Sequence, residues 1–223
     1  MDGTLVDTEP YWMAAEYALV AAHGGTWSDE HAHALVGNAL LTSAEYIREH
    51  GGVDLPAAEI VERLLDDVVR ATVASIPWRP GGAALLDELH RHGVPCGLVT
   101  MSYARLATAV LDALAPGTFD VVVTGDQVAD GKPHPEPYLT AAARLGVDPA
   151  KCVAVEDSPT GVASAEAAGC VVVGVPHRVP IEAAASRTLV ASLADLTVDR
   201  LDELVRAHDG LRSPPVGQQP ELC

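Results

Sequence analysis

The chain has 223 residues, of which 48% are hydrophobic and 20% charged, and its formal net charge is −17. This length supplies a core of ordinary size, so a soluble globular protein is expected without stabilising disulfides. This negative net charge argues against a broad binding surface for nucleic acid or anionic lipid. A metal and a few cationic side chains can still bind a small anionic substrate.

The N-terminal residues show no basic region followed by an apolar run, and no apolar stretch reaches ~18 residues. Neither a secretory signal nor a membrane span is therefore expected. The four cysteines, Cys96, Cys152, Cys170 and Cys223, form no CxxC pair. Buried free thiols in a cytoplasmic protein are the favoured interpretation, and a zinc site is the minor alternative.

The segment 9–78 has a helical pattern and no strand signal. The first predicted helix begins at Pro10, runs through residue 22 and ends at a Gly-Gly pair. Further helices are expected after an N-cap at Ser28, over about 42–50, and over 57–74. We therefore predict a small all-helical domain over 9–78.

From residue 79 onwards, short apolar runs alternate with helical segments. This alternation is typical of βα units in a parallel sheet, and strands that are apolar throughout are expected to be buried on both faces. The expected strands are 94–99, 120–124, 152–155 and 171–175, and the expected helices are 83–92, 104–114, 137–145 and 161–168. The predicted fold class is therefore α/β, with a parallel sheet in the segment that follows the helical domain and a disordered tail over 210–223.

Polar residues follow three of the predicted strands. Thr100 follows the first, Lys132 lies in the loop after the second, and Glu156 and Asp157 follow the third. Ligands of open α/β sheets bind beyond the carboxyl ends of the strands. A Thr hydroxyl and a Lys ammonium suit a phosphoryl group, and adjacent carboxylates suit Mg²⁺. Each signal alone is weak, since a turn Thr, a solvated Lys and an Asp helix cap are common, but together they favour a phosphate site.

Four segments resemble, in order and spacing, the motifs of the haloacid dehalogenase-like (HAD) hydrolase superfamily. They are Asp-Gly-Thr-Leu-Val-Asp-Thr-Glu-Pro at 2–10, Val-Thr-Met-Ser at 99–102, Gly-Lys-Pro-His-Pro-Glu-Pro at 131–137 and Val-Glu-Asp-Ser-Pro-Thr-Gly-Val at 155–162. The chain is most similar to the helical-cap subgroup, which includes phosphoglycolate phosphatase-like and β-phosphoglucomutase-like members. The resemblance implies a Rossmann-like core formed by 1–8 and 79–209, with the helices of 9–78 inserted as a cap domain. It also implies Mg²⁺ as cofactor, a small phosphorylated metabolite as partner, and a monomer or homodimer.

The resemblance also implies a role for each matched residue. Asp2 would be the general acid–base, and its main-chain carbonyl would bind Mg²⁺ together with Glu156 and Asp157. Lys132 would neutralise the phosphoryl group. The other phosphate-binding residues would be Gly3, Thr100 and Met101, the last through its backbone amide at the start of a helix.

The nucleophile is the exception. In the family the first motif reads Asp-x-Asp-Gly-Thr, and its first Asp takes the phosphoryl group. Asp2 aligns with the second Asp, so the nucleophile would stand immediately before Met1, and Asp7 lies too far beyond the Gly-Thr turn to replace it. Either the nucleophile has been lost or the sequence begins one motif late. We expect the second, because the first strand is central in this fold and its absence would leave a gap of ~9.6 Å between its neighbours.

The expected function is Mg²⁺-dependent hydrolysis of small phosphate monoesters through an aspartyl-phosphate, and the 223-residue chain itself is expected to be inactive. Two alternatives stay open: a β-phosphoglucomutase-like mutase and a catalytically dead protein that binds phosphate ligands. Trp12 and Leu40 stand where the mutases carry a His and an Arg. This favours a phosphatase, although packing in the cap core explains both residues equally well.

Overall fold

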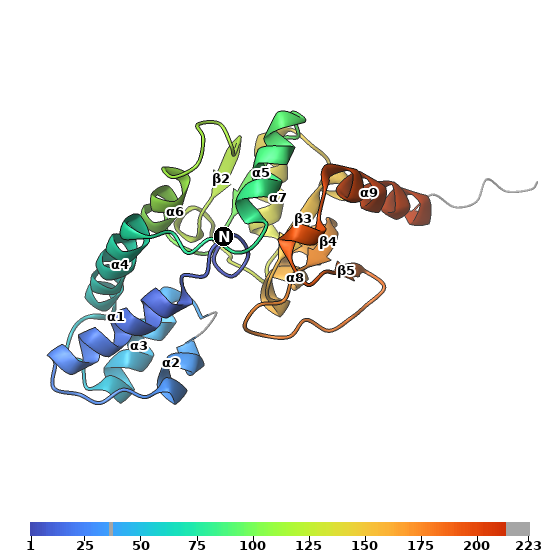
Figure 1. The fold of residues 1–223 in the computed structure, drawn as a ribbon. Coiled ribbons are helices and arrows are strands. Elements are labelled where there is room, and N and C mark those ends of the chain that lie inside the picture. Colours follow the sequence, from blue (N-terminus) through green and yellow to red (C-terminus); the bar gives the residue numbers. More distant parts are fainter. Residues whose placement is uncertain (36–37, 213–223) are drawn as a thin grey trace, which may run out of the picture.

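The computed structural model describes residues 1–35 and 38–212, and it has two parts (Figure 1). One part is a group of helices without strands, and the other alternates strands and helices. The helical part consists of α1 (Glu9–Ala22), α2 (Asp29–Leu35), α3 (Leu40–Gly51) and α4 (Ala57–Ala74). Helix α1 begins with Pro10 in its first turn, where the missing N–H costs nothing.

The apolar core of the helical part continues into the other part of the molecule. In α4, buried side chains recur every three or four residues and so form one stripe along the helix. These side chains are Ile60, Val61, Leu64, Leu65 and Val68. The stripe faces α1 and α3, which contribute buried residues such as Val20 and Ile47 to the same cluster, and α4 also packs against the helix Ala104–Leu111 of the other part. The burial of this stripe holds the helices together.

The other part contains parallel strands connected by helices, which confirms the α/β class. Its strands are β1 (Gly97–Val99), β2 (Val121–Val123), β3 (Val153–Glu156), β4 (Val171–Gly174) and β5 (Arg187–Leu189). Its helices are α5 (Gly82–Arg91), α6 (Ala104–Leu111), α7 (Glu136–Leu145), α8 (Pro159–Ala167) and α9 (Val198–Arg212). Among the described residues, no helix is long and apolar enough to cross a membrane.

Within the described residues, the strands do not form one continuous sheet. β1 pairs with β2 in parallel, with Gly97 opposite Val121, and β3, β4 and β5 form a second parallel sheet in that order. β1 and β3 therefore each lie at the edge of their own sheet. The sheet predicted from the sequence is interrupted between these two strands.

The two connections between the parts lie side by side. Val6 forms an antiparallel bridge with Trp78, and the Asp7 amide donates to the Pro77 carbonyl at 2.9 Å. The chain therefore enters and leaves the helical part at one place, through two paired segments. This arrangement supports the proposed limits of the helical domain, 9–78, which stay a prediction.

Three details differ from the sequence-based expectations. α9 runs to Arg212, so residues 210–212 are helical rather than disordered, and the rest of the predicted tail, 213–223, lies outside the described residues. The strand expected over 94–99 is shorter, because Pro95 has no N–H for a ladder. Strand β5 was not predicted, since its Arg-Thr-Leu sequence lacks an apolar run.

Candidate active site

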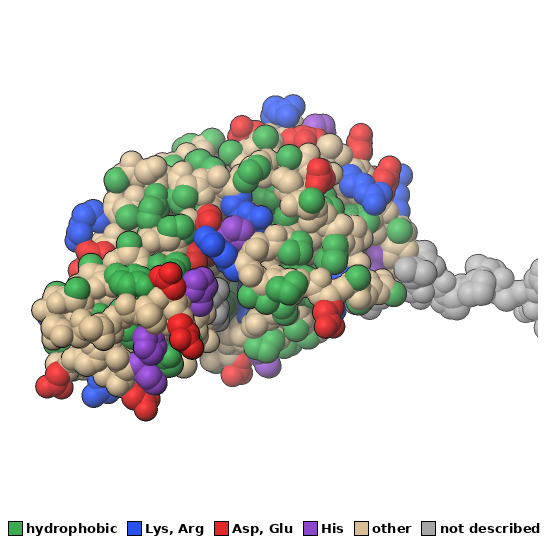
Figure 2. All heavy atoms as spheres, turned by 60° about the horizontal axis from the view of Figure 1, so that its bottom comes forward, with side chains coloured by type: hydrophobic (Ala, Val, Ile, Leu, Met, Phe, Trp, Pro, Cys, Tyr) green, Lys and Arg blue, Asp and Glu red, His purple; other side chains and the backbone are tan. Residues whose placement is uncertain are grey.

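A cleft of about 650 Å³ lies between the helical part and the carboxyl ends of the strands. Figure 2 shows a hollow between the two parts, with acidic, basic and His side chains gathered around it. All of the site residues predicted from the sequence line this cleft: Asp2, Gly3, Thr100, Met101, Lys132, Glu156 and Asp157. The structure thus brings together residues that are up to 155 positions apart in the sequence.

The turn at Gly3 shapes one wall of the cleft. Gly3 has a φ of 72°, and a Cβ at this position would lie 2.0 Å from Oδ2 of Asp157. Only glycine therefore allows the carboxylate to lie against this turn. The Thr4 hydroxyl donates to Oδ1 of Asp157 at 2.7 Å, and the Arg79 guanidinium donates to the Gly3 carbonyl. The turn and the Asp157 side chain thus hold each other in place.

The carboxylate of Asp2 is held by hydroxyl groups. Ser102 donates to Oδ2 at 2.6 Å and Thr8 donates to Oδ1 at 2.5 Å, while the Thr100 hydroxyl lies 3.5 Å from Oδ2. The contacts from Ser102 and Thr8 were not predicted, although both residues lie inside the quoted motifs. Because Asp2 is partly exposed and oriented on both oxygens, it can exchange a proton with a group in the cleft.

Lys132 is held by a set of buried acceptors. Its Nζ donates to the Val99 carbonyl at 3.1 Å and to Oε1 of Glu156, and the Tyr138 hydroxyl donates to the same carboxylate oxygen. The Tyr138 ring lies 5.0 Å from Nζ. Burial raises the pKa of Glu156, but the charge and hydrogen bond of Lys132, with help from Tyr138, outweigh it, so the pKa lies below its usual value. Tyr138 was missed, because nothing in the sequence places it beside Lys132.

The side chain of Met101 contacts the backbone of Lys132. The Lys132 amide donates to Sδ of Met101 at 3.3 Å, and a Cβ at Gly125 would lie 2.2 Å from the Met101 carbonyl oxygen. Close packing therefore fixes the backbone at Met101, as a main-chain donor to a phosphate requires.

The residues near Asp157 fit a divalent cation. The pKa of Asp157 is raised, first by burial and then by the negative charge of Glu156. A cation beside this carboxylate would offset that repulsion, and Mg²⁺ prefers oxygen ligands. Because Glu156 already accepts from Lys132 and Tyr138, Asp157 is better placed to bind the metal directly, and Glu156 to position Lys132.

Among the described residues, one group of potential metal ligands has its atoms within 4.8 Å of one another, and it lies elsewhere, at Asp130, His134 and Glu136. The Glu136 carboxylate accepts from the amides of Ala129 and Asp130, both at 2.9 Å, which lowers its pKa. His134 accepts from the Glu136 amide through Nδ1. These contacts order the loop that carries Lys132, and we assign no metal to them.

The helical part lines the cleft with apolar and acidic side chains. Trp12 and Leu40 both lie on this wall, together with Glu9 and Glu16, and among its described residues no Lys or Arg lines the cleft. Burial raises the pKa of Glu16 to about 8, although a hydrogen bond from Trp27 opposes the shift. The helical part therefore offers no positive charge to a second anionic group, and Arg178, which lines the cleft from the α/β part, is paired with Asp7.

Comparison with known proteins is consistent with this geometry. The model of the haloacid dehalogenase-like hydrolases matches residues 1–169. The chain belongs to this family. Hexitol phosphatase A of Escherichia coli is 36% identical over 179 residues, which cover 78% of this chain and 80% of that protein. Validoxylamine A 7'-phosphate phosphatase of Streptomyces hygroscopicus subsp. limoneus is 34% identical over 206 residues, which cover 88% of this chain and 92% of that protein.

Solved structures agree. The structure of CbbY from Rhodobacter sphaeroides in complex with phosphate matches with a TM-score of 0.80 and 31% identity, over 91% of this chain and 96% of that chain. β-Phosphoglucomutase from Clostridium difficile matches with a TM-score of 0.77 over 94% of this chain and 96% of that chain. At 22% identity, this second match shows only that the two proteins share a fold.

Proposed function

We propose that this HAD-family hydrolase is a Mg²⁺-dependent phosphatase that acts on small phosphate monoesters. The observation that carries the proposal is the position of Lys132, Thr100, Asp2 and Asp157 around one cleft at the carboxyl ends of the strands. Relatives covered over about 80% or more of their length are phosphatases of phosphorylated small molecules, which supports this assignment.

The residues of the cleft have different roles in the proposed reaction. Lys132 and Thr100 bind the phosphoryl oxygens, with Lys132 supplying the positive charge that stabilises them during transfer. Asp2 gives a proton to the leaving alcohol and then takes one from the attacking water. Bound Mg²⁺, held by Asp157 and the main-chain carbonyl of Asp2, would add charge stabilisation for the phosphoryl oxygens.

The proposed nucleophile is an Asp joined directly to the nitrogen of Met1, as the first family motif implies. Its carboxylate oxygen attacks phosphorus, the bond from phosphorus to the leaving oxygen breaks, and the alcohol leaves with the proton of Asp2. Water then attacks the aspartyl-phosphate, Asp2 accepts a water proton, and inorganic phosphate is released.

The charge of the cleft indicates the class of leaving group. The helical wall opposite the phosphate-binding residues has no Lys or Arg among its described residues, so a second phosphate or a carboxylate on the substrate would find no opposite charge on this wall. A neutral, hydroxyl-bearing leaving group fits better, as in a hexitol phosphate. Trp12 and Leu40 on the same wall offer no charge that would hold a bisphosphate, which argues against the mutase alternative.

A substrate panel tests this function. The protein is extended before Met1 by an apolar strand that ends in Asp, and phosphate release is measured from sorbitol 6-phosphate, 2-phosphoglycolate and β-glucose 1-phosphate. We expect Mg²⁺-dependent release that is fastest from sorbitol 6-phosphate and is abolished by EDTA. Efficient conversion of β-glucose 1-phosphate to glucose 6-phosphate without phosphate release would contradict the proposal and favour the mutase.

A further inference from the structure

Two His side chains lie close together at the surface of the helical part. His31 belongs to α2 and His50 to the last turn of α3, and both are exposed. Their ring centroids are 5.7 Å apart, and the ring planes are tilted by 48°. Figure 2 shows exposed His side chains on this part of the molecule. Neither His31 nor His50 lines the cleft, so the pair is separate from the candidate active site.

Tyr46 contacts both imidazole rings. Its own ring stacks on that of His50, with centroids 4.0 Å apart and planes at 17°. The Tyr46 hydroxyl lies 3.0 Å from Nδ1 of His31, and the Tyr46 main-chain carbonyl lies 3.0 Å from Nδ1 of His50. Two oxygens of one residue therefore orient both rings through the same nitrogen.

These contacts leave the second nitrogen of each ring available. A carbonyl only accepts, so neutral His50 carries its proton on Nδ1 and a lone pair on Nε2. The Tyr46 hydroxyl can accept from Nδ1 of His31 in the same way, which gives His31 the same tautomer. Across residues 1–35 and 38–212, neither Nε2 takes part in a hydrogen bond or an ion pair. A His that binds a metal usually donates its other ring N–H to an oxygen in this manner.

The separation of the rings fits a single metal ion. With metal–nitrogen bonds of ~2.1 Å, two imidazoles on one tetrahedral ion have centroids ~5 Å apart. The observed 5.7 Å is close to this value, and exposed side chains can rotate to remove the difference. Imidazole nitrogen suits Zn²⁺, Ni²⁺ and Cu²⁺, whereas Mg²⁺ prefers oxygen ligands.

We propose that His31 and His50 bind one divalent transition-metal ion through their Nε2 atoms, and that Tyr46 is the residue that orients both rings. The two imidazoles supply two ligands, and water completes the coordination. The ion joins α2 to α3 on the outside of the helical part. It is distinct from the Mg²⁺ proposed at Asp157, and it does not depend on the proposed function.

Trp27 provides a native probe of this site. Its ring stacks on that of His31, with centroids 4.8 Å apart and planes at 23°. A paramagnetic ion such as Ni²⁺ quenches the fluorescence of an adjacent indole. The Trp27 indole N–H also donates to Glu16, which lines the cleft. The same contacts therefore report the bound ion and connect its site to the cleft wall.

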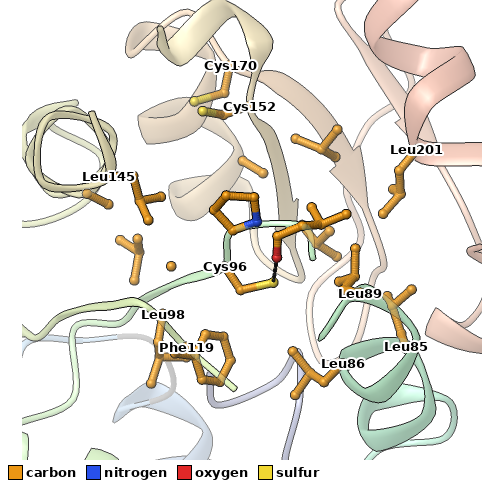
Figure 3. A pocket seen from close by; sticks show the side chains of 18 of the residues that line it. Leu85, Leu86, Leu89, Cys96, Leu98, Phe119, Leu145, Cys152, Cys170 and Leu201 are labelled. Carbon is orange, nitrogen blue, oxygen red and sulfur yellow. Dashed lines mark hydrogen bonds between the residues drawn. The ribbon is translucent and has the colours of Figure 1, made fainter. Parts of the chain in front are cut away.

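The thiols of the α/β part are competing ligands for such ions. Figure 3 shows Cys96, Cys152 and Cys170 around an apolar cavity of about 780 Å³. No residue that lines this cavity belongs to the helical part. An ion bound to these thiols is therefore expected to leave Trp27 unquenched, and variants that keep all thiols share the same background.

The experiment titrates the untagged protein with Ni²⁺ in saturating Mg²⁺ and follows tryptophan fluorescence and binding heat. We expect saturable quenching by one ion per chain. Loss of a residue that orients a ligand typically costs ~10–100-fold in metal affinity, so Tyr46→Phe should weaken binding at least ~10-fold. His31→Ala and His50→Ala each remove a ligand and should weaken it at least as much.

His92→Ala is the matched control. His92 is exposed, and its Nδ1 lies 2.8 Å from the Glu88 carbonyl, four residues earlier, as the Nδ1 of His50 does from that of Tyr46. We expect this variant to bind Ni²⁺ like the unsubstituted protein. Far-UV circular dichroism verifies the fold of each variant.

Three results would overturn the proposal. One is unchanged Ni²⁺ affinity in both His31→Ala and His50→Ala. Another is a loss of affinity in His134→Ala but not in these two variants, because the ion would then belong to the loop that carries Lys132. If an Ala variant loses helical structure, Tyr46→Phe decides, since it removes only a hydroxyl group, and unchanged affinity in that variant would contradict the site.

Discussion

The ammonium of Lys132 and the carboxylate of Glu156 form an ion pair that is almost closed to water, with side chains only 10% and 5% exposed. The Tyr138 hydroxyl donates to the same carboxylate. A charge buried in this way is costly once its partner is removed, whereas the loss of a single hydrogen bond costs less. These two contacts therefore hold in place the side chain of Lys132, the residue proposed to bind phosphate.

This relationship predicts unequal losses of stability. Glu156→Ala leaves the Lys132 ammonium buried without its partner and is expected to cost about 3–5 kcal/mol of unfolding free energy. Tyr138→Phe removes one hydrogen bond to a charged group and is expected to cost about 1.5–3 kcal/mol. Urea unfolding measures both. The matched control is Tyr11→Phe, since the Tyr11 hydroxyl donates at an exposed site; equal losses in all three variants would contradict the prediction.

The second prediction concerns Asp2 in the protein extended by a strand that ends in Asp. Asp2→Asn keeps the hydrogen-bond acceptor for Ser102 but removes the transferable proton. We expect a loss of ~10²–10⁴-fold on sorbitol 6-phosphate, whose alkoxide needs protonation, and a smaller loss on p-nitrophenyl phosphate, whose leaving group does not. Phosphoenzyme should accumulate, because Asp2 also activates the water. Equal losses on the two esters would exclude Asp2 from the acid–base role.

The third prediction locates the metal. Asp157→Ala is expected to weaken Mg²⁺ binding at least ~10-fold, because it removes the carboxylate that is best placed to bind the cation. Isothermal titration with Mg²⁺ measures this without reference to activity. The control is Asp130→Ala, which alters the exposed loop cluster and should leave the affinity unchanged. If Asp130→Ala weakened binding and Asp157→Ala did not, the metal would belong to the loop.

The fourth prediction follows from Glu16, whose pKa burial raises to about 8. In the unfolded chain a Glu has a pKa near ~4.3, so between pH ~4.3 and 8 the folded protein holds a proton that the unfolded chain has lost. The contribution of Glu16 to stability therefore falls as the pH rises through this window, by up to ~1.4 kcal/mol per pH unit.

The substitution Glu16→Gln removes this titration. Relative to the unsubstituted protein, the variant is expected to gain stability steadily from pH 5 to pH 8, as measured by urea midpoints at each pH. The control Glu49→Gln alters an exposed side chain and should run parallel to the unsubstituted protein. A constant difference between Glu16→Gln and the unsubstituted protein across this range would show that Glu16 does not titrate in it.

Local sequence signals predicted most of the helices, because their ends are set by the residues themselves. α4 was predicted over 57–74 and is found there, because its apolar stripe has helical spacing and Pro56 immediately precedes its first residue. α6 ends at Leu111 rather than at residue 114. Residues 112–114 form turns and a bend, and the spacing of apolar residues does not distinguish these from a further turn of helix. β5 was not predicted because an edge strand can be short and polar.

The candidate site was predicted as a set of residues but not as a set of contacts. Strand ends and motif spacing placed Thr100, Lys132 and Asp157 at one edge, because the carboxyl ends of parallel strands meet there. The partners that hold them, such as Tyr138 and Ser102, depend on which side chain reaches across the edge. Side-chain packing in the folded protein determines these contacts, and they cannot be read from a single sequence.

The hydrogen bond between Thr8 and Asp2 joins the two parts of the molecule at the point where chemistry is proposed. Thr8 is the residue from which α1 begins, and its hydroxyl holds one oxygen of the Asp2 carboxylate. A rotation of the helical part about the paired segments at Val6 and Trp78 would displace the start of α1 and break that hold. The Asp2 carboxylate would then keep only the contacts from Ser102 and Thr100, so the orientation of the proposed acid–base depends on the position of the helical part over the cleft.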